Sequence, residues 1–247
     1  MTQPYTSAFY EGQMTGSLSS AEIVVPLVLS TFKINSVVDF GCGAGSWLKA
    51  FSNNGIHDYL GIDGDYVPRD KLEIPQDRFQ AQDLANISPV DRKYDLACSL
   101  EVAEHLPASC AEHFVSVLVG AAPVILFSAA VPGQGGTNHI NEQWQSYWSN
   151  LFNKNGYITL DFIRPKIFGD DRVEYWYQQN ILVFCDPAYR PDNIIATSER
   201  YYLDRIHPEL FSIVQEGPRT GREAQRILFR SIQVIGQAAA RKLRRAS

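Results

Sequence analysis

Three glycines at alternate positions, between a short apolar run and a helical pattern, constrain this chain more than any other feature. Residues 37–38 are β-branched, as in a buried strand, and residues 46–51 have the apolar spacing of an amphipathic helix. Gly41, Gly43 and Gly45 lie between them, where the backbone must turn sharply. A strand, a glycine turn and a helix form the first βα unit of a doubly wound sheet, which binds ligands at the carboxyl ends of its strands. The sequence therefore predicts an α/β domain with a ligand site at this turn.

The spacing of these glycines argues against a dinucleotide as the ligand. A dinucleotide site uses the pattern G-x-G-x-x-G/A, whereas this turn has G-x-G-x-G with Ser46 in the third small position. Asp39 precedes the turn, and a carboxylate there disfavours a phosphate and favours an ammonium group. We therefore expect a ligand that carries a positive charge near the turn.

Residues 39–45, Asp-Phe-Gly-Cys-Gly-Ala-Gly, resemble motif I of the class I S-adenosylmethionine (SAM) methyltransferases. The resemblance implies SAM as the cofactor and an α/β fold of the Rossmann-like, doubly wound type. Its seven-stranded sheet would be mostly parallel with an antiparallel last strand, and a helical N-terminal lid and a C-terminal helix would flank it. The stretch from residue 36 to residue 185 also resembles bacterial methyltransferases of polysaccharide and secondary-metabolite clusters. A glycine turn in another kind of α/β domain is the alternative.

The resemblance and the local patterns together predict how the chain is organised. Residues 1–35 form the lid and a helix capped at Ser19 or Ser20, and residues 36–186 form the SAM-binding core. Residues 187–247 form an irregular cover followed by a basic helix over residues 219–245. Within the core we expect strands over residues 59–63, 78–81, 94–100, 124–129, 157–164 and 180–185, and helices over residues 111–118 and 141–155.

Acidic residues at the ends of the second and third expected strands are suited to bind the cofactor. Asp63 follows Gly45 by 18 residues, which suits a carboxylate that accepts hydrogen bonds from the ribose hydroxyls. By the resemblance, Asp83 meets the adenine amino group, Leu84 covers the adenine ring, and the N-terminal lid folds over the cofactor. The predicted cofactor-binding residues are Tyr10 and Gln13 of the lid, Asp39, Gly41, Gly43, Asp63, Gly64, Asp83, Leu84 and Glu101.

The fourth expected strand leads into a cluster of residues that could assist the reaction. Methyl transfer from a sulfonium needs a positioned acceptor and, for an alcohol, removal of its proton. Glu101, Glu104 and His105 have i, i+3, i+4 spacing and would share one face if the turn were helical. His139, in the glycine-rich loop after the fifth strand, could converge on them.

This E-x-x-E-H pattern resembles two groups of metal-assisted O-methyltransferases, the ubiquinone-biosynthesis enzymes and the small-RNA 3′-end enzymes. The resemblance implies a divalent metal ion, magnesium or manganese, on Glu101, Glu104, His105 and His139. The alternative needs no metal and makes His139 or His105 a general base, since the pKa of histidine is near neutrality. Glu142, on the same loop as His139, is a further candidate catalytic residue.

The charge distribution along the chain indicates which kind of methyl acceptor to expect. The net charge is −5, but residues 217–247 carry +7, so the remaining residues carry −12. An acidic catalytic domain argues against nucleic acid as a partner and favours a small or uncharged substrate. Polar and aromatic side chains suited to a sugar ring gather after His139 and before the last strand, unless they are core: Asn138, Asn141, Glu142, Trp144, Tyr147, Tyr175, Trp176 and Tyr177.

We therefore predict a SAM-dependent methyltransferase that acts on a hydroxyl of a sugar or small hydroxylated metabolite. The alternatives are a metal-dependent RNA 2′-O-methyltransferase, a non-catalytic SAM-binding partner protein and a small-molecule N-methyltransferase. Four cysteines that stand singly favour a reducing compartment, here the cytoplasm. The most apolar region, residues 114–131, is interrupted by Gly120 and Pro123, so no membrane span is expected. A homodimer is compatible with the sequence.

Overall fold

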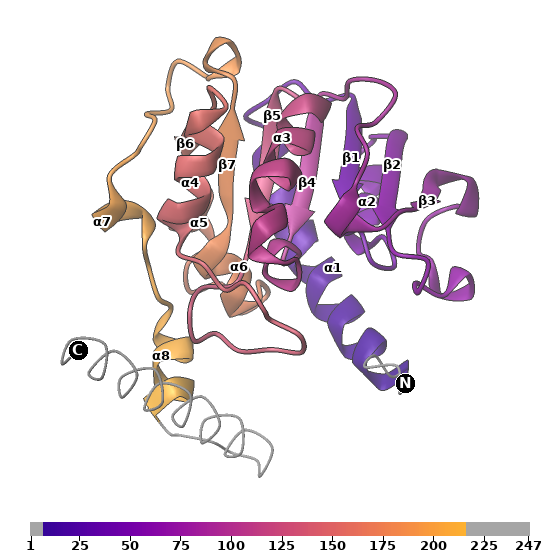
Figure 1. Ribbon diagram of the computed structural model, residues 1–247, viewed down its shortest axis with the longest axis horizontal. Coiled ribbons are helices and arrows are strands. Elements are labelled where there is room, and N and C mark those ends of the chain that lie inside the picture. The colour runs from indigo at the N-terminus through magenta and orange to yellow at the C-terminus, as the bar shows by residue number, and fades with distance from the viewer. Residues whose placement is uncertain (1–6, 216–247) are drawn as a thin grey trace, which may run out of the picture. The chain divides into compact units, whose positions relative to one another are not determined.

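A seven-stranded sheet organises the fold in the computed structural model, which describes the backbone of residues 7–215 and the side chains of residues 16–214. The strand order is β3-β2-β1-β4-β5-β7-β6 (Figure 1). Only β7 runs antiparallel to its neighbours, β5 and β6, which confirms the predicted mostly parallel sheet with an antiparallel last strand. The strands are β1 (Ser36–Phe40), β2 (Asp58–Asp63), β3 (Phe79–Ala81), β4 (Leu96–Leu100), β5 (Val124–Ser128), β6 (Ile158–Leu160) and β7 (Leu182–Cys185).

Helices alternate with these strands, and the chain divides into two compact units, Met1–His207 and Pro208–Ser247. The sheet and seven of the described helices belong to the first unit, and α8 (Pro208–Gln215) belongs to the second. The helices of the first unit are α1 (Ser7–Leu29), α2 (Ser46–Asn53), α3 (Ala111–Ala121), α4 (Gln145–Lys154), α5 (Arg164–Ile167), α6 (Tyr175–Asn180) and α7 (Arg200–Leu203).

Two hydrophobic cores cover the two faces of the sheet, because successive side chains of a strand point to opposite faces. Val37 packs into one core together with residues of α1, α2 and α6, whereas its neighbour Val38 packs into the other with residues of α3 and α4. Leu126 and Phe127 of β5 divide in the same way. The unit is therefore a three-layer α/β/α domain, and its glycine turn lies where β1 passes into α2 (Figure 1).

The N-terminal helix is longer than the sequence predicts. It begins at Ser7, so the expected start at Ser19 or Ser20 is wrong. The Ser20 hydroxyl does not cap the helix; it donates to the carbonyl of Gly16 one turn earlier, at 2.8 Å. A serine inside a helix can bond the preceding turn in this way, which the local sequence does not distinguish from a cap.

The region between β5 and β7 also differs from the prediction. Residues 141–144 are not helical, because the backbone N–H groups of Ile140 and Asn141 donate to the carbonyl of Glu104 and hold this segment in a loop. The strand expected over residues 157–164 stops at Leu160. The aromatic and amide residues 175–180 form the short helix α6 before β7 begins.

A buried ion pair fastens these short elements to the sheet. Arg164, only 1% exposed, donates to both carboxylate oxygens of Asp161 at 2.8 and 2.7 Å. The same guanidinium donates to the backbone carbonyls of Gln179 and Leu203 at 3.0 and 2.8 Å. One side chain thus joins α5 to the end of α6 and to α7, as the forked donors of arginine allow.

Some predictions fall outside the described residues. The basic helix expected over residues 219–245 is one of them, as are the side chains of Tyr10 and Gln13, whose backbone lies in α1. None of the described helices combines the length and the apolar character that a membrane crossing requires.

We predict that Arg164→Met destabilises the protein by about 3 kcal/mol, because it leaves Asp161 buried with only the half-exposed Arg205, 3.7 Å away, to offset its charge. The free energy of unfolding in urea measures the effect. Arg172→Met is the control, since its ion pair with Asp170 lies at the surface and its loss should cause no resolvable change. Equal stabilities for the two variants would contradict the anchoring role of Arg164.

Candidate functional site

A cavity of about 440 Å³ lies at the carboxyl ends of β1, β2 and β4, where a doubly wound sheet is expected to bind its ligand. Its size suits a small molecule rather than a macromolecule. Most of the predicted cofactor-binding residues meet here although they come from four separate segments. The cavity is lined, among others, by Gly41, Gly43, Asp63, Gly64, Asp83, Leu84, Glu101 and His105.

The glycine turn brings backbone rather than side chains to the cavity. Gly41 has φ = 89°, and a Cβ atom there would lie 2.2 Å from Val102, so no other residue fits without displacing Val102. Gly43 has φ = 54°, and a Cβ atom there would meet nothing within 4 Å. The turn therefore leaves open space above Gly43, into which a ligand can come close to the main chain.

The Asp63 carboxylate ties the end of β2 to this turn. Its Oδ2 accepts a hydrogen bond from the backbone N–H of Gly43 at 2.7 Å. Its Oδ1 accepts two, from the backbone N–H of Gly64 and from the hydroxyl of Tyr66, both at 2.6 Å. Asp63 is only 4% exposed yet lines the cavity, so its carboxylate is both structurally fixed and within reach of a ligand.

Asp39 lies beneath the turn and does not line the cavity. Burial, together with the nearby charge of Asp63, raises the pKa of Asp39 from 3.8 to about 7. Two carboxylates thus place negative potential under the glycine turn. A positively charged ligand would relieve their repulsion, as the sequence predicts for the ammonium group of the cofactor.

Asp83 and Leu84 line the cavity on the side of β3. Asp83 caps a short 3₁₀ turn by accepting from the backbone N–H of Ala85 at 3.0 Å, and its other oxygen accepts from Asn86 at 2.7 Å. A carboxylate has about four acceptor positions, so Asp83 keeps capacity for a ligand donor.

Helix α1 reaches the rim of the same cavity. Ser17 lines it, and its hydroxyl lies 3.2 Å from the hydroxyl of Tyr177, which also accepts from the indole of Trp47 at 3.4 Å. The lid residues Tyr10 and Gln13 precede this attachment point by one to two helical turns. Their predicted contacts with the cofactor stay predictions.

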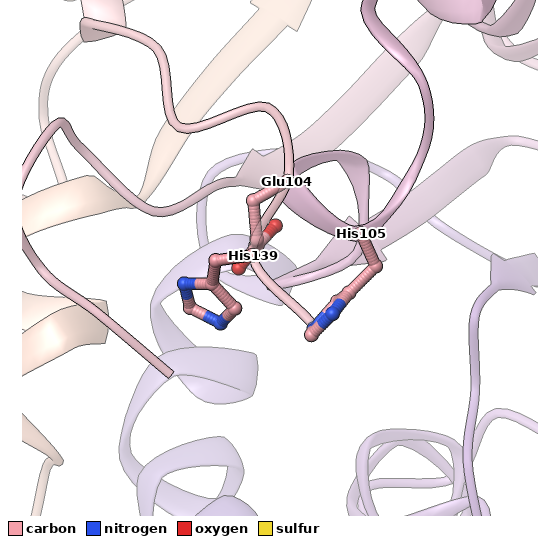
Figure 2. A group of neighbouring side chains, drawn as sticks. All are labelled: Glu104, His105 and His139. Atoms are coloured by element: carbon pink, nitrogen blue, oxygen red, sulfur yellow. The ribbon is translucent and has the colours of Figure 1, made fainter. Parts of the chain in front are cut away.

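At the far end of the cavity, Glu104, His105 and His139 come together (Figure 2). One potential ligand atom from each lies within 4.8 Å of the others. Figure 2 shows the Glu104 carboxylate close to the two imidazole rings, whose centres are 4.8 Å apart. His105 also lines the cavity, so the group is continuous with it.

Glu101, the fourth predicted metal ligand, lies outside this group. Residues 103–105 form a 3₁₀ turn, but Glu101 has a left-handed backbone with φ = 56° and is not helical. The expectation that a helical turn would align Glu101 with Glu104 and His105 is therefore wrong. Its carboxylate instead lines the cavity.

The electrostatics of the group of three are unusual. Glu104 is fully buried, and no hydrogen bond of good geometry reaches either of its carboxylate oxygens from the described residues, although the backbone N–H groups of Glu104 and Ala130 lie near enough to favour its charged form. Burial and the neighbouring charge of Glu101 raise its pKa well above the ordinary value. Burial, assisted by His139, lowers the pKa of His105 to about 4, so this imidazole is neutral near pH 7.

These residues fit a divalent cation. Nδ1 of His105 is buried without a hydrogen bond among the described residues, and Nδ1 of His139 faces Glu142, which leaves Nε2 of that ring as its available ligand atom. Neutral imidazole nitrogens and a carboxylate are ligands that first-row transition metals accept, and a bound cation would compensate the buried carboxylate.

Glu142 orients the loop that carries His139. Its carboxylate oxygens accept from the backbone N–H groups of Gly133 and Gly135 at 2.9 and 2.8 Å, and one lies 3.4 Å from Nδ1 of His139. Burial alone would raise the pKa of Glu142, but the interactions with His139 and the two N–H groups outweigh it and lower the pKa. Glu142 does not line the cavity, so it is placed to act through His139.

The sequence did not indicate a cluster of buried amides that holds Glu101. Asn180 Nδ2 and Gln134 Nε2 each donate to one oxygen of its carboxylate, at 3.1 and 2.9 Å. Gln179 accepts from the backbone N–H of His207 at 2.7 Å and must therefore turn its own amino group toward Gln134 and Asn180. Burial raises the pKa of Glu101, and the amide donors act in the opposite direction.

The only local signal for this cluster is a run of three amide residues, 178–180, before the last strand. Nothing in that run points to a partner about 80 residues earlier. Of the residues expected to form the acceptor wall, Asn138 and Tyr177 line the cavity, whereas the others do not. Asn141 is buried and donates to the carbonyl of Ala103, and Tyr147 packs against Trp148.

The sequence matches a methyltransferase family model, and the fold is similar to those of solved methyltransferase structures. Residues 14–118 match the family model of a methyltransferase domain, and no curated protein sequence matches the chain significantly. Among solved structures, the chain is similar to a chain of the complex between the Haloferax volcanii Trm112 methyltransferase activator and a methyltransferase (TM-score 0.54, 16% identity, 72% of this chain and 95% of that one).

Two further structures have comparable similarity. The plantazolicin methyltransferase BpumL in complex with SAH gives a TM-score of 0.51 at 17% identity, over 73% of this chain and 88% of that one. The methyltransferase domain of bacterial CtHen1 gives 0.50 at 20% identity, over 68% and 98%. At these identities the similarity shows a shared fold.

We predict that Asp39→Asn stabilises the ligand-free protein at pH 8 by about 2–4 kcal/mol, because it removes a buried charge. The folded-state pKa of Asp39, about 7, lies above its ordinary 3.8. Wild-type stability therefore decreases as the pH rises from about 4 to about 7, and the uncharged amide of the variant removes this decrease. Urea unfolding at pH 5 and pH 8 measures it, with the exposed Asp77→Asn as control. A difference between variant and wild type that is the same at both pH values would contradict the prediction.

Proposed function

We propose that the chain is a SAM-dependent methyltransferase of class I and that it transfers the methyl group to a hydroxyl oxygen of a sugar or another small hydroxylated metabolite; the methyltransferase domain model that matches residues 14–118 supports the first part. The observation that carries this proposal is the group of Glu104, His105 and His139 at one end of the cavity. An amine acceptor would need no such assembly, since a neutral amine is already nucleophilic, whereas an alcohol must lose its proton.

In this proposal the cofactor occupies the cavity. Asp63 accepts from the ribose hydroxyls, Asp83 and Leu84 bind the adenine, and the backbone at Gly43 approaches the amino-acid part. The support for this arrangement is that these groups line one cavity and that buried carboxylates beneath the turn favour a cation. Glu101, held by its two amide donors, faces the same cavity from β4 and adds negative charge next to the site of the sulfonium.

The acceptor would bind beside His105 and His139. A divalent cation on Glu104, His105 and His139 would, when bound, acidify the acceptor hydroxyl. The chain's own contribution is to keep the His105 imidazole neutral, by the burial that lowers its pKa to about 4, and to bring it next to His139, whose ring faces Glu142. If no cation binds, His139 is the candidate to accept the proton, because the lowered pKa of His105, about 4, makes that imidazole a weak base.

The charge of the domain supports a neutral acceptor over RNA. Residues 1–216 carry a net charge of −12, and the cavity lining includes the acidic side chains of Asp63, Asp83 and Glu101, with Glu104 behind them. A polyanion would meet repulsion there, whereas sugar hydroxyls can donate to carboxylates.

We predict that the wild-type protein binds Mn²⁺ and that Glu104→Gln weakens this binding at least tenfold, on the order of the loss expected for one ligand. Calorimetric titration with MnCl₂, in the absence of acceptor, measures it. Glu112→Gln is the matched control, because Glu112 is an exposed residue of α3. Absence of Mn²⁺ binding to the wild-type protein would contradict the cation and leave His139 as the base.

We further predict that His139→Ala lowers turnover by a factor of about 10²–10⁴ and leaves SAM affinity within about twofold, because His139 is not among the residues that line the cavity proposed for the cofactor. The measurement is methyl transfer from labelled SAM to a panel of glycosides and polyols, together with calorimetry of SAM binding. Full turnover by the variant would contradict both roles proposed for His139.

A further inference from the structure

The hydroxyl of Tyr66 occupies a hydrogen-bonding position that a bound ribose would need. Asp63 Oδ1 already accepts from the backbone N–H of Gly64 and from Tyr66, both at 2.6 Å, and Oδ2 accepts from Gly43 at 2.7 Å. A carboxylate oxygen has two lone pairs, and the whole group about four acceptor positions. Oδ1 is therefore saturated, and only Oδ2 keeps one position.

A ribose presents two vicinal hydroxyls, which pair with a carboxylate most favourably when each oxygen accepts one of them. With Tyr66 in place, three donors and two ribose hydroxyls would exceed the four acceptor positions of Asp63. The backbone N–H groups of Gly43 and Gly64 belong to the turn and to the end of β2, so they cannot leave without moving the main chain. Tyr66 is the one donor that a side-chain rotation can remove.

The surroundings of Tyr66 allow this rotation. The residue is 59% exposed, so little apolar surface must be brought into water when the ring leaves. In its present position the ring lies against the backbone of Gly64, where a Cβ atom would be 2.0 Å from Cε1 of Tyr66. Both Gly64 and Tyr66 line the cavity, so the ring covers the main chain along which a ligand would lie.

We propose that Tyr66 is an intramolecular competitor for the cofactor's ribose: its hydroxyl holds the Oδ1 position of Asp63 in the free protein, and the ribose diol displaces it on binding. This inference rests on the proposed placement of the ribose at Asp63. The free protein thereby keeps Oδ1 of a buried carboxylate saturated, and cofactor binding must open the Tyr66–Asp63 hydrogen bond first.

Tyr66→Phe tests this competition because it removes the hydroxyl and keeps the ring. We expect the variant to bind S-adenosylhomocysteine about five- to tenfold more tightly than wild type in calorimetry, since a hydrogen bond to a charged group no longer reduces the binding-competent population. Tyr189→Phe is the matched control, because Tyr189 is similarly exposed, at 56%, and does not line the cavity. It should leave the affinity unchanged.

Ligands that lack one ribose hydroxyl make the test specific. A 2′-deoxy or 3′-deoxy analogue brings only one hydroxyl, so Asp63 can accept it while Tyr66 stays in place. The gain from Tyr66→Phe should therefore disappear for the analogue that lacks the hydroxyl facing Oδ1. A variant that binds S-adenosylhomocysteine more weakly than wild type, or one that gains equally for all three ligands, overturns the proposal.

A further variant separates this inference from its premise. Asp63→Asn should weaken S-adenosylhomocysteine binding at least tenfold, with thermal unfolding confirming that the protein is folded. Unchanged affinity in Asp63→Asn would show that the ribose does not bind at Asp63, and the proposed placement would fail together with the inference. If Asp63→Asn binds S-adenosylhomocysteine more weakly and Tyr66→Phe binds it no more tightly than wild type, the placement of the ribose stands and only the competition by Tyr66 is overturned.

Discussion

Burial of carboxylates at one edge of the sheet is the constraint on which the rest of the site depends. Asp39, Asp63, Glu101 and Glu104 all lie at or near the ends of β1, β2 and β4, where a charged group loses most of its hydration. Each is accommodated differently. Asp63 accepts three hydrogen bonds and Glu101 is held by two amides, whereas Asp39 has a raised pKa and Glu104 has no hydrogen-bond partner among the described residues.

In the proposed function, these differences correspond to what each carboxylate would bind. Asp63, which accepts three hydrogen bonds, is where the neutral ribose of the cofactor would bind, and Glu104, which accepts none of good geometry from the described residues, is where a cation would compensate the carboxylate. Between them, the side-chain amides of Gln134 and Asn180 hold the Glu101 carboxylate in a fixed orientation. The amide of Gln179 bonds to both of these amides and is itself oriented by the backbone N–H of His207. The sheet supplies this order because its parallel strands end at the same edge, so neighbouring loops meet there.

How much the sequence could predict depends on whether the signal was local. The glycine turn, the strand that ends on Asp63 and the sheet with its antiparallel last strand all follow from short patterns and the resemblance they carry. The longer α1, the left-handed backbone of Glu101 and the contact of Tyr66 with Asp63 do not, because each depends on tertiary neighbours. The amides of Gln134 and Asn180 meet Glu101 only because β4, the loop after β5 and α6 share one end of the sheet.

The unfavourable burial of charge at such a site must be offset elsewhere in the domain. Two hydrophobic cores, one on each face of the sheet, bury all residues of β1, β4, β5 and β7, and the Arg164–Asp161 pair fixes the short elements around β7. Apolar burial contributes roughly 25 cal/mol per Å², so cores of this extent can offset a few kcal/mol of unfavourable charge burial. The acidic edge is therefore tolerated in the free protein, and it becomes favourable when positive charge arrives. A positively charged ligand relieves the repulsion between the carboxylates of Asp39 and Asp63 and gains affinity from it. The site beneath the glycine turn therefore favours a cationic cofactor over a neutral one.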